Sequence, residues 1–159
     1  MPELPEVETT RRGIESSVVG HVIKKVIVRE PRLRWRVPRE LPELAAGQRE
    51  VRLRRRAKYL VFDLERGSMI LHLGMSGSLR VLPAATPPSM HDHVDIVMDT
   101  GLCLRFNDPR RFGSLLWTVA DPLEHKLLKS LAPEPLSDDF NGEYLARAAK
   151  GRSVAIKQL

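Results

Sequence analysis

The chain has 159 residues, which suits one domain with a hydrophobic core and is short for two. Hydrophobic residues make up 42% and charged residues 29%, a composition that excludes a disordered chain, and no apolar run has the length of a membrane span or an export signal. The net charge of +6 indicates a polyanionic partner or a merely basic surface, and the single cysteine excludes internal disulfides and a zinc site built from several cysteines. We therefore expect a cytoplasmic protein.

The first six residues, Met-Pro-Glu-Leu-Pro-Glu, have two interpretations. If Met1 is removed, Pro2 becomes a terminal secondary amine that can attack a sugar aldehyde carbon and form an iminium without a metal or cofactor. Glu3 and Glu6 lie within one helical turn of this amine, as general acid–base chemistry requires. Alternatively, these residues simply begin a helix, because proline and glutamate favour its first turn. Taken alone, the motif favours the helix start.

Periodicity predicts one helix followed by many short strands. A helix is expected over Pro5–Val19, with apolar residues at helical spacing and Gly20 as its stop. The strand-like segments have Gly, Asp-Pro or Thr-Gly between many of them. They are His21–Arg29, Glu50–Lys58, Tyr59–Glu65, Ser68–Leu73, Ser78–Leu82, His91–Asp99, Leu102–Phe106 and Ser114–Val119.

This order of elements predicts an α+β fold that is mainly β. We expect an antiparallel β-sandwich or flattened barrel, flanked by the N-terminal helix and by C-terminal helices over Leu123–Ser130 and Glu143–Ala149. Pro83–Pro88 is expected to be a loop. The division expected is a catalytic domain over residues 1–135 and the start of a helical domain over residues 136–159. Because the last apolar segment stops at Leu159 without a polar tail, we expect a truncated chain.

A basic segment lies in the second predicted strand. Arg52, Arg54 and Arg56 alternate on one face, with Arg55 and Lys58 beside them. Cations gathered on a short strand repel one another unless a negative group lies over them, and duplex phosphate is one such group. A solvated strand face explains the segment equally well.

The segment Asn107–Gly113 predicts a tight turn, since Pro109 presets the backbone and Gly113 permits the exit. The turn would project two guanidiniums, those of Arg110 and Arg111, and the ring of Phe112 outward together. An arginine beside an apolar wedge suits insertion into a base stack. The alternative is that Phe112 folds back into the core.

Two further motifs admit a structural and a functional interpretation. Met75 lies in a glycine-flanked loop, where methionine serves well as a core plug, and this is the favoured interpretation of that motif alone. His91, His93 and Asp95 alternate along a strand and so share a face, as metal ligands would. Since nearby third and fourth ligands are lacking, imidazole donating to phosphate is the preferred interpretation, and we expect no metal.

Taken together, these segments closely resemble the bacterial formamidopyrimidine-DNA glycosylase family, whose members excise 8-oxoguanine. The matching stretches follow the family order along the whole chain: MPELPEVETTRRG (1–13), RRAKYL (55–60), HLGMSGSLR (72–80), HDHV (91–94), DPRRFG (108–113) and PEPLSDDFNG (133–142).

The resemblance implies roles for four catalytic residues. Pro2 would be the nucleophile that forms the Schiff base, and Glu3 would protonate the sugar oxygen. Glu6 would be a supporting carboxylate, and Lys58 would act at the lesion phosphate and in elimination.

The resemblance also implies DNA-binding residues. Some of these residues would contact the DNA backbone, and others would fill the hole left by the extruded nucleotide. A further basic residue of the family, which contacts DNA, aligns with a glycine of this chain that lies between two cations. These residues are His91 at the backbone, Met75, Arg110 and Phe112 in the hole, and Gly151 with its neighbours Lys150 and Arg152.

The function implied is base-excision repair of double-stranded damaged DNA by a monomer that binds no membrane. The enzyme would remove oxidised purines and cleave the abasic site by β,δ-elimination. A sister branch, the endonuclease-eight-like enzymes, prefers oxidised pyrimidines, but Leu4 and residues 91–94 favour the purine branch. A non-catalytic duplex-DNA-binding fragment is a further alternative, and the charge alone would also fit an RNA-binding protein.

One departure from the family concerns zinc. Its members continue into a helix–two-turn–helix segment and a four-cysteine zinc finger, both missing from these 159 residues. We therefore expect that this chain ligates no cofactor. Weak or no glycosylase activity is expected of it in isolation.

Overall fold

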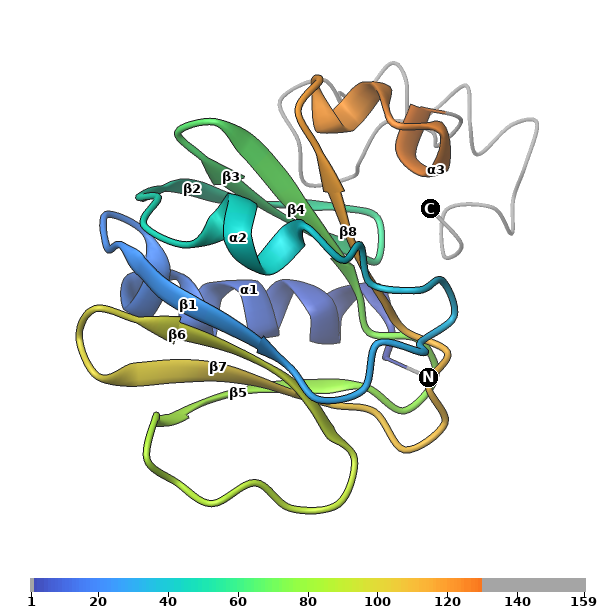
Figure 1. Cartoon of the computed structure of the whole chain (residues 1–159). Helices are drawn as coiled ribbons and strands as arrows, with labels where there is room; N and C mark the ends of the chain where they lie inside the picture. The colour runs from blue at the N-terminus through green and yellow to red at the C-terminus, as the bar shows by residue number, and fades with distance from the viewer. Residues whose placement is uncertain (1, 130–159) are drawn as a thin grey trace.

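Two four-stranded antiparallel sheets face one another in the computed structural model, which describes residues 2–129 (Figure 1). The first sheet has the order β1-β6-β7-β5 and the second the order β2-β3-β4-β8. The strands of the first are β1 (Ile23–Val28), β6 (Asp92–Met98), β7 (Leu102–Asn107) and β5 (Ser78–Pro83). Those of the second are β2 (Glu50–Arg56), β3 (Tyr59–Leu64), β4 (Gly67–His72) and β8 (Ser114–Thr118). The predicted mainly-β antiparallel fold is confirmed.

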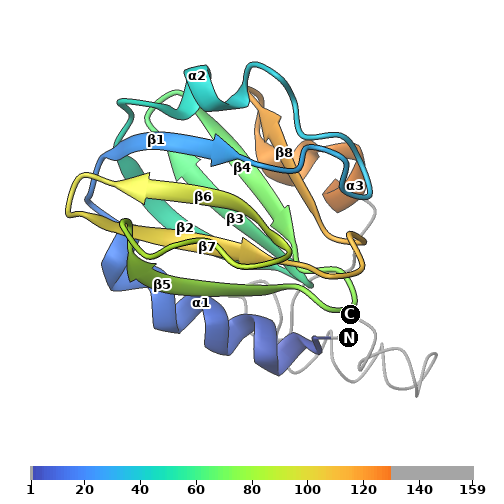
Figure 2. The ribbon, with the colours of Figure 1, turned by 60° about the horizontal axis from the view of Figure 1, so that its bottom comes forward.

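Helix α1 (Leu4–Val18) lies where β2 and β5 form the edges of the two sheets (Figure 2). A proline in its first turn removes an N–H that would have no partner there. Its apolar stripe, Val7, Ile14 and Val18, is buried at helical spacing. The helix ends at Val18, one residue before the predicted end, because Val19 is extended and the chain then turns away from the helix axis. The site is built at the opposite, amino-terminal end.

One core lies between the sheets and α1. Phe62 and Met69 of the second sheet and Leu104 and Phe106 of the first are almost fully buried in it. Each such side chain contributes roughly 1.5–3 kcal/mol relative to exposure. A smaller cluster on the other face of the second sheet includes Leu128.

The loop between β5 and β6 is fixed to the first sheet by a buried arginine. Arg105 pairs with Asp95, its Nε lying 2.9 Å from Oδ1, and also donates to the carbonyls of Thr86 and Pro87. A buried guanidinium needs both a counter-ion and acceptors for its remaining N–H groups. The loop carbonyls supply the acceptors and so position the chain that leads into β6.

Two short helical elements differ from the predictions. The helix predicted near Leu123–Ser130 is divided in the part of the chain that the structure describes: η1 (Pro122–Glu124) and α3 (Lys126–Lys129) are separate, because His125 between them is extended. Helix α2 (Leu41–Ala45), which packs beside β1, was not predicted, since one turn shows no periodicity.

The predicted strand over Glu50–Lys58 ends two residues early, at Arg56. The backbone of Ala57 has a φ of +52°, which is incompatible with a strand. Lys58 therefore lies on the β2–β3 turn.

The predicted domain boundary at residues 135/136 and the predicted helix Glu143–Ala149 lie outside the described residues. Among residues 2–129, no helix combines the length and the apolar character needed to cross a bilayer.

Candidate active site

The amino-terminal end of α1 carries three of the predicted catalytic residues. Pro2 lies immediately before Glu3, the residue that precedes α1, and is half-buried, whereas Glu3 and Glu6 are exposed. Glu3 is the N-cap, and its carbonyl accepts from the N–H groups of Glu6 and Val7. This end of α1 lies at the same end of the molecule as the loops after β4 and β7 (Figures 1 and 2).

Lys58 lies beside this helix end. Its Nζ is 3.6 Å from Oε2 of Glu3, and its side chain is largely buried. The contact joins residues that are 55 positions apart in the sequence and belong to different elements. An ammonium and a carboxylate thus lie together next to the half-buried Pro2.

His72, at the end of β4, continues the site away from Lys58. Its ring packs against Tyr59 at 4.7 Å between centroids, and its Nδ1 accepts from the N–H of Gly74 at 2.9 Å. Burial, and then the nearby cations of Lys58 and Arg34, lower the pKa of His72. The ring is therefore neutral at physiological pH, and Nε2 carries its proton.

The loop of Met75 and the turn of Phe112 pack against each other. A Cβ at Gly74 would lie 2.4 Å from the nitrogen of Gly113, so the backbones approach as closely as glycine permits. The buried carboxylate of Asp108 bonds both segments, accepting from Ser76 Oγ and from the N–H of Gly113, each at 2.8 Å. The two loops form one rigid unit.

This unit presents two exposed apolar side chains, Met75 at 42% and Phe112 at 43% exposure. The guanidinium carbon of Arg110 is 5.1 Å from the centroid of the Phe112 ring. The alternatives in which Phe112 folds into the core and Met75 plugs it are therefore wrong. Both side chains line an open pocket of about 230 Å³ together with Arg34, His72 and Gly74.

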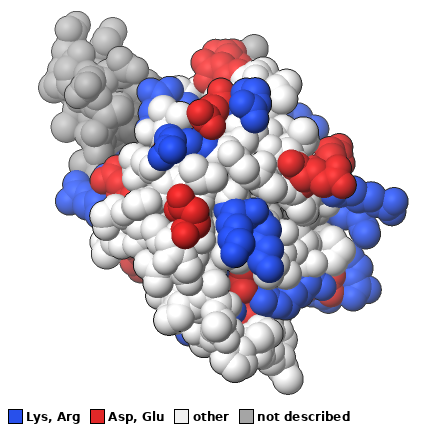
Figure 3. Space-filling model, turned by 60° about the vertical axis from the view of Figure 1, so that its left-hand side comes forward, with Lys and Arg blue, Asp and Glu red and all other residues white. Residues whose placement is uncertain are grey.

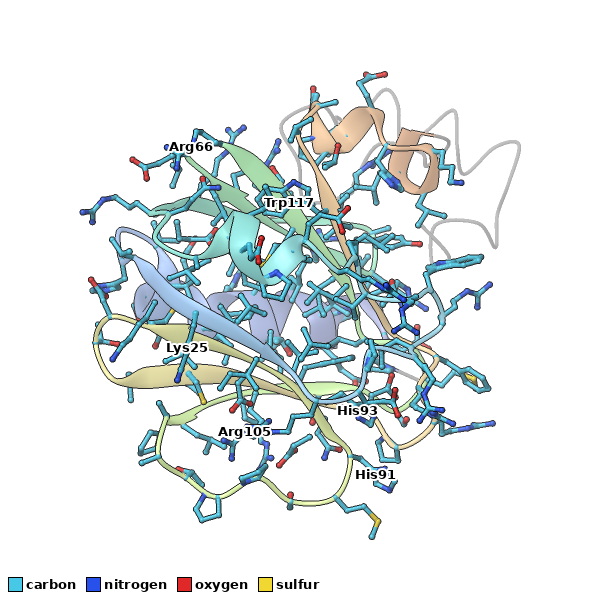
Figure 4. The ribbon with its side chains drawn as sticks, in the orientation of Figure 1. Lys25, Arg66, His91, His93, Arg105 and Trp117 are labelled. Carbon is cyan, nitrogen blue, oxygen red and sulfur yellow. The ribbon has the colours of Figure 1, made fainter. Side chains whose placement is uncertain are left out.

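His91 lies next to the Phe112 turn, because its carbonyl accepts from the N–H of Asp108. It is exposed and has a φ of +71°, whereas His93 is buried and contacts the carbonyl of Asp108 at 2.7 Å (Figure 4). Asp95 is held by Arg105. No group of three potential metal ligands occurs among residues 2–129.

The negative group over the basic strand is part of the protein. Asp63 on β3 accepts from Arg52 at 2.9 Å and from Arg54 at 2.6 Å. Phosphate is therefore not required to explain these two arginines. The face of the molecule in Figure 3, turned forward from the left of Figure 1, has basic and acidic groups interspersed.

Three residues not predicted from the sequence as site residues, Arg34, Trp35 and Tyr59, line a second pocket of about 230 Å³. The other residues lining it are His72, Phe112, Ser114 and Leu127. Trp35 is 47% exposed, and the Arg34 guanidinium lies 5.4 Å from its ring centroid. The signal was present in residues 32–39, where arginines alternate with Leu, Trp and Val. The predicted contacts Lys150, Gly151 and Arg152 lie outside the described residues.

The described residues form a two-sheet domain in which Lys58 meets Glu3 at the amino-terminal end of a helix and a nearby turn exposes Phe112. Comparison with known proteins identifies the class of protein to which this domain belongs. Residues 1–115 match the family model of the formamidopyrimidine-DNA glycosylase N-terminal domain, and the chain belongs to this family.

The relatives are longer than this chain. It is 55% identical to the formamidopyrimidine-DNA glycosylase of Stutzerimonas stutzeri over 157 residues, 99% of this chain and 58% of that protein. The Lactococcus lactis enzyme bound non-covalently to DNA containing an AP site is 31% identical, with a TM-score of 0.80 over 94% of this chain and 58% of that one. A complex of the Lactococcus lactis enzyme with DNA containing an oxidised pyrimidine is 34% identical, with a TM-score of 0.76 over 84% of this chain and 51% of that one. The chain thus spans little more than half the length of these proteins.

Proposed function

We propose that this chain is the catalytic amino-terminal part of a bifunctional DNA glycosylase and AP lyase that removes oxidised purines from duplex DNA. The observation that carries the proposal is the contact of Lys58 with Glu3 beside Pro2. Family membership supports the same chemistry, since the relatives are formamidopyrimidine-DNA glycosylases.

After removal of Met1, the unprotonated nitrogen of Pro2 attacks C1′ of the damaged nucleotide. The N–C1′ bond forms as the bond to the base breaks, and the base leaves with the electron pair. The Glu3 carboxylate takes the proton that the Pro2 nitrogen loses after its attack and donates it to the sugar oxygen as the ring opens, which leaves an iminium between Pro2 and C1′. The iminium acidifies C2′, so loss of that proton expels the 3′ phosphate, and a second elimination expels the 5′ phosphate.

Lys58 and Glu6 support these steps without covalent attachment. The Lys58 ammonium neutralises the phosphate of the lesion nucleotide and so orients its sugar toward Pro2. Glu6, in the first turn of α1, adds a negative potential that stabilises the developing iminium.

The exposed unit of Met75, Arg110 and Phe112 acts on the duplex itself. A stacked base cannot reach Pro2, so the nucleotide must be turned out and the gap filled. Phe112 and Met75 suit the gap, and Arg110 can pair with the exposed base edge. His91 lies beside them and donates to the phosphate backbone.

The candidate substrate of a different class is an oxidised pyrimidine. The Lactococcus lactis relative has been captured with DNA containing such a base, which favours testing it here. Excision of 8-oxoguanine should exceed excision of thymine glycol, and the reverse order would assign the chain to the pyrimidine-preferring branch.

Zinc binding belongs to the four-cysteine finger of the family and does not fit the residues described here. The only cysteine of the chain, Cys103, is buried in β7, and residues 2–129 contain no cluster of three potential ligands. No step above therefore involves zinc. We propose residues 1–135 as the catalytic domain, residues 136–159 as the start of a helical one, and a monomer acting in the bacterial cytoplasm.

Borohydride trapping tests the proposal. The chain, freed of Met1, is incubated in excess with a duplex that contains an abasic site, and the reduced adduct is mapped by mass spectrometry. We expect the cross-link at Pro2 and its loss in Pro2→Gly. A cross-link that maps to a lysine, or an undiminished adduct in Pro2→Gly, contradicts the mechanism.

A further inference from the structure

The turn that carries Lys58 has an unusual residue at its centre. Arg56 and Tyr59 are paired across the hairpin, so Ala57 and Lys58 form a two-residue connection. Ala57 has a φ of +52°, a conformation in which such turns normally use glycine or asparagine. An alanine here is strained, and surrounding contacts must hold it.

Arg55 supplies such a contact. Its Nη1 donates to the carbonyl of Ala57 at 3.0 Å, and its Nε donates to Oε1 of Glu8 at 3.0 Å. The side chain is only 3% exposed, so both bonds lie out of bulk water, where they are stronger. One guanidinium thus joins the strained turn to α1.

Glu8 is itself firmly held on the helix. It accepts from Arg11 at 2.9 Å and from Arg12 at 2.7 Å as well as from Arg55. These hydrogen bonds, that of Arg11 above all, lower the pKa of Glu8 to about 2, so its charge persists at physiological pH. The anchor for Arg55 is therefore a permanent carboxylate on the helix that begins beside Pro2 and Glu3.

We propose that Arg55 is a positioning residue for Lys58: by bridging Glu8 and the Ala57 carbonyl, it fixes the turn that holds the Lys58 ammonium against Glu3. The inference rests on the proposed role of Lys58. Beyond that role, the planar guanidinium of Arg55, which donates to α1 and to the β2–β3 turn, sets the distance between the Lys58 ammonium and Glu3. Lysine at position 55 keeps the charge but cannot reproduce the rigid fork.

A double-mutant cycle tests this coupling. The rate of reductive trapping on an abasic duplex is measured, with protein in excess, for the wild-type chain, Arg55→Lys, Lys58→Ala and the double variant. Arg55→Lys should slow trapping about 10-fold or more, because small displacements of a catalytic group are costly. In the Lys58→Ala background the same change should have little further effect, since Arg55 acts through Lys58.

Arg12→Lys is the matched control. Arg12 pairs with the same Glu8 but is 69% exposed, and this ion pair does not involve the turn. It should trap at the wild-type rate. If Arg55→Lys does not fold, Glu8→Gln, which weakens the anchor, replaces it in the cycle.

A second readout does not depend on activity. The rate of reductive methylation of Lys58 in the free protein, followed by mass spectrometry, should rise in Arg55→Lys and stay unchanged in Arg12→Lys. Multiplicative effects in the cycle together with an unchanged methylation rate would overturn the inference. If Lys58→Ala itself traps at the wild-type rate, the proposed role of Lys58 fails instead.

Discussion

Backbone strain in this protein is concentrated at individual residues of the candidate site. Among residues 2–129, the non-glycine residues with positive φ are Ala57, His91 and Arg111. Ala57 precedes Lys58, His91 contacts the Phe112 turn, and Arg111 lies within that turn. Each such residue costs on the order of 1–3 kcal/mol, so the fold must support it through contacts elsewhere. The strain is what lets these turns project charged and apolar side chains together.

Phe112 should be important for DNA binding and unimportant for folding. Because its ring is 43% exposed, Phe112→Ala should change the free energy of unfolding by less than about 1 kcal/mol. Affinity for a lesion duplex should fall about 10-fold or more, the loss of one stacked aromatic ring. Denaturant unfolding and fluorescence anisotropy measure the two effects. Val119→Ala, which truncates an 83% exposed side chain outside the site, is the control. Equal affinities of the two variants would contradict the role of the ring.

Residue-scale prediction from the sequence succeeded where one local motif determines the outcome. The proline and glycine around Phe112 predicted a turn with an outward ring, and the ring is exposed. For Met75, general packing preference favoured a core plug, but close contact of the loop with the Phe112 turn leaves it exposed. The pairing of Asp63 with Arg52 required the register of β2 on β3, which the sequence does not contain.

At the scale of elements, the site depends on the contact between the β4–β5 and β7–β8 loops. Gly74 meets the backbone of Gly113, and Asp108 hydrogen-bonds both loops. Because the backbones of the two loops are in direct contact here, a change of side-chain rotamer cannot make room for an added atom. The orientation of the wedge side chains is therefore a property of the pair of loops.

Gly74→Ala should separate these loops. Gly101→Ala is the matched control, because both glycines have positive φ (+67° and +90°) but only Gly74 has a neighbour within 4 Å of the added Cβ. The left-handed backbone cost is common to both, so their difference measures the loop contact. Gly74→Ala should be less stable than Gly101→Ala by roughly 1–3 kcal/mol in denaturant unfolding. Equal stabilities would mean that the loops adjust freely.

Elements were predictable to the extent that they are local. The α1 stripe and the short alternating strands carry their own periodicity, so their existence was predicted with shifts of one or two residues. The sheet order places β1 beside β6, about 70 residues later, and such long-range pairing has no local signal. The predicted end of β2 was wrong because position 57, which adopts a left-handed backbone conformation, is an alanine and not the glycine that usually marks such a turn.

At the scale of the whole molecule, the two sheets are joined around α1, and the site lies where the helix begins. Lys58, on the turn between β2 and β3 of the second sheet, lies against Glu3 at the amino-terminal end of α1, and His91 directly precedes β6 of the first sheet. Any loosening of the sandwich would change their distances. The proposed chemistry therefore requires a stably folded sandwich. One group expected to change the free energy of unfolding with pH is a buried glutamate.

Glu50, at the start of β2, should make the protein less stable at alkaline pH. It is 1% exposed, Oε2 has no hydrogen-bond partner, and burial together with the charge of Asp63 raises its pKa to about 9. The folded protein therefore keeps a proton that the unfolded chain, with a pKa near 4.5, releases. This contribution to stability is complete below about pH 4.5 and is lost as the pH rises to about 9.

Glu50→Gln should remove this dependence, because the amide cannot ionise. Its free energy of unfolding relative to wild type should increase with pH across that window, by up to about 1.4 kcal/mol per pH unit. Denaturant unfolding of both proteins at several pH values measures the difference. Glu43→Gln, which alters an exposed carboxylate on α2, should run parallel to wild type. A Glu50→Gln curve that also runs parallel would show that Glu50 is ionised in the folded protein, and the core would then have to hold an uncompensated charge.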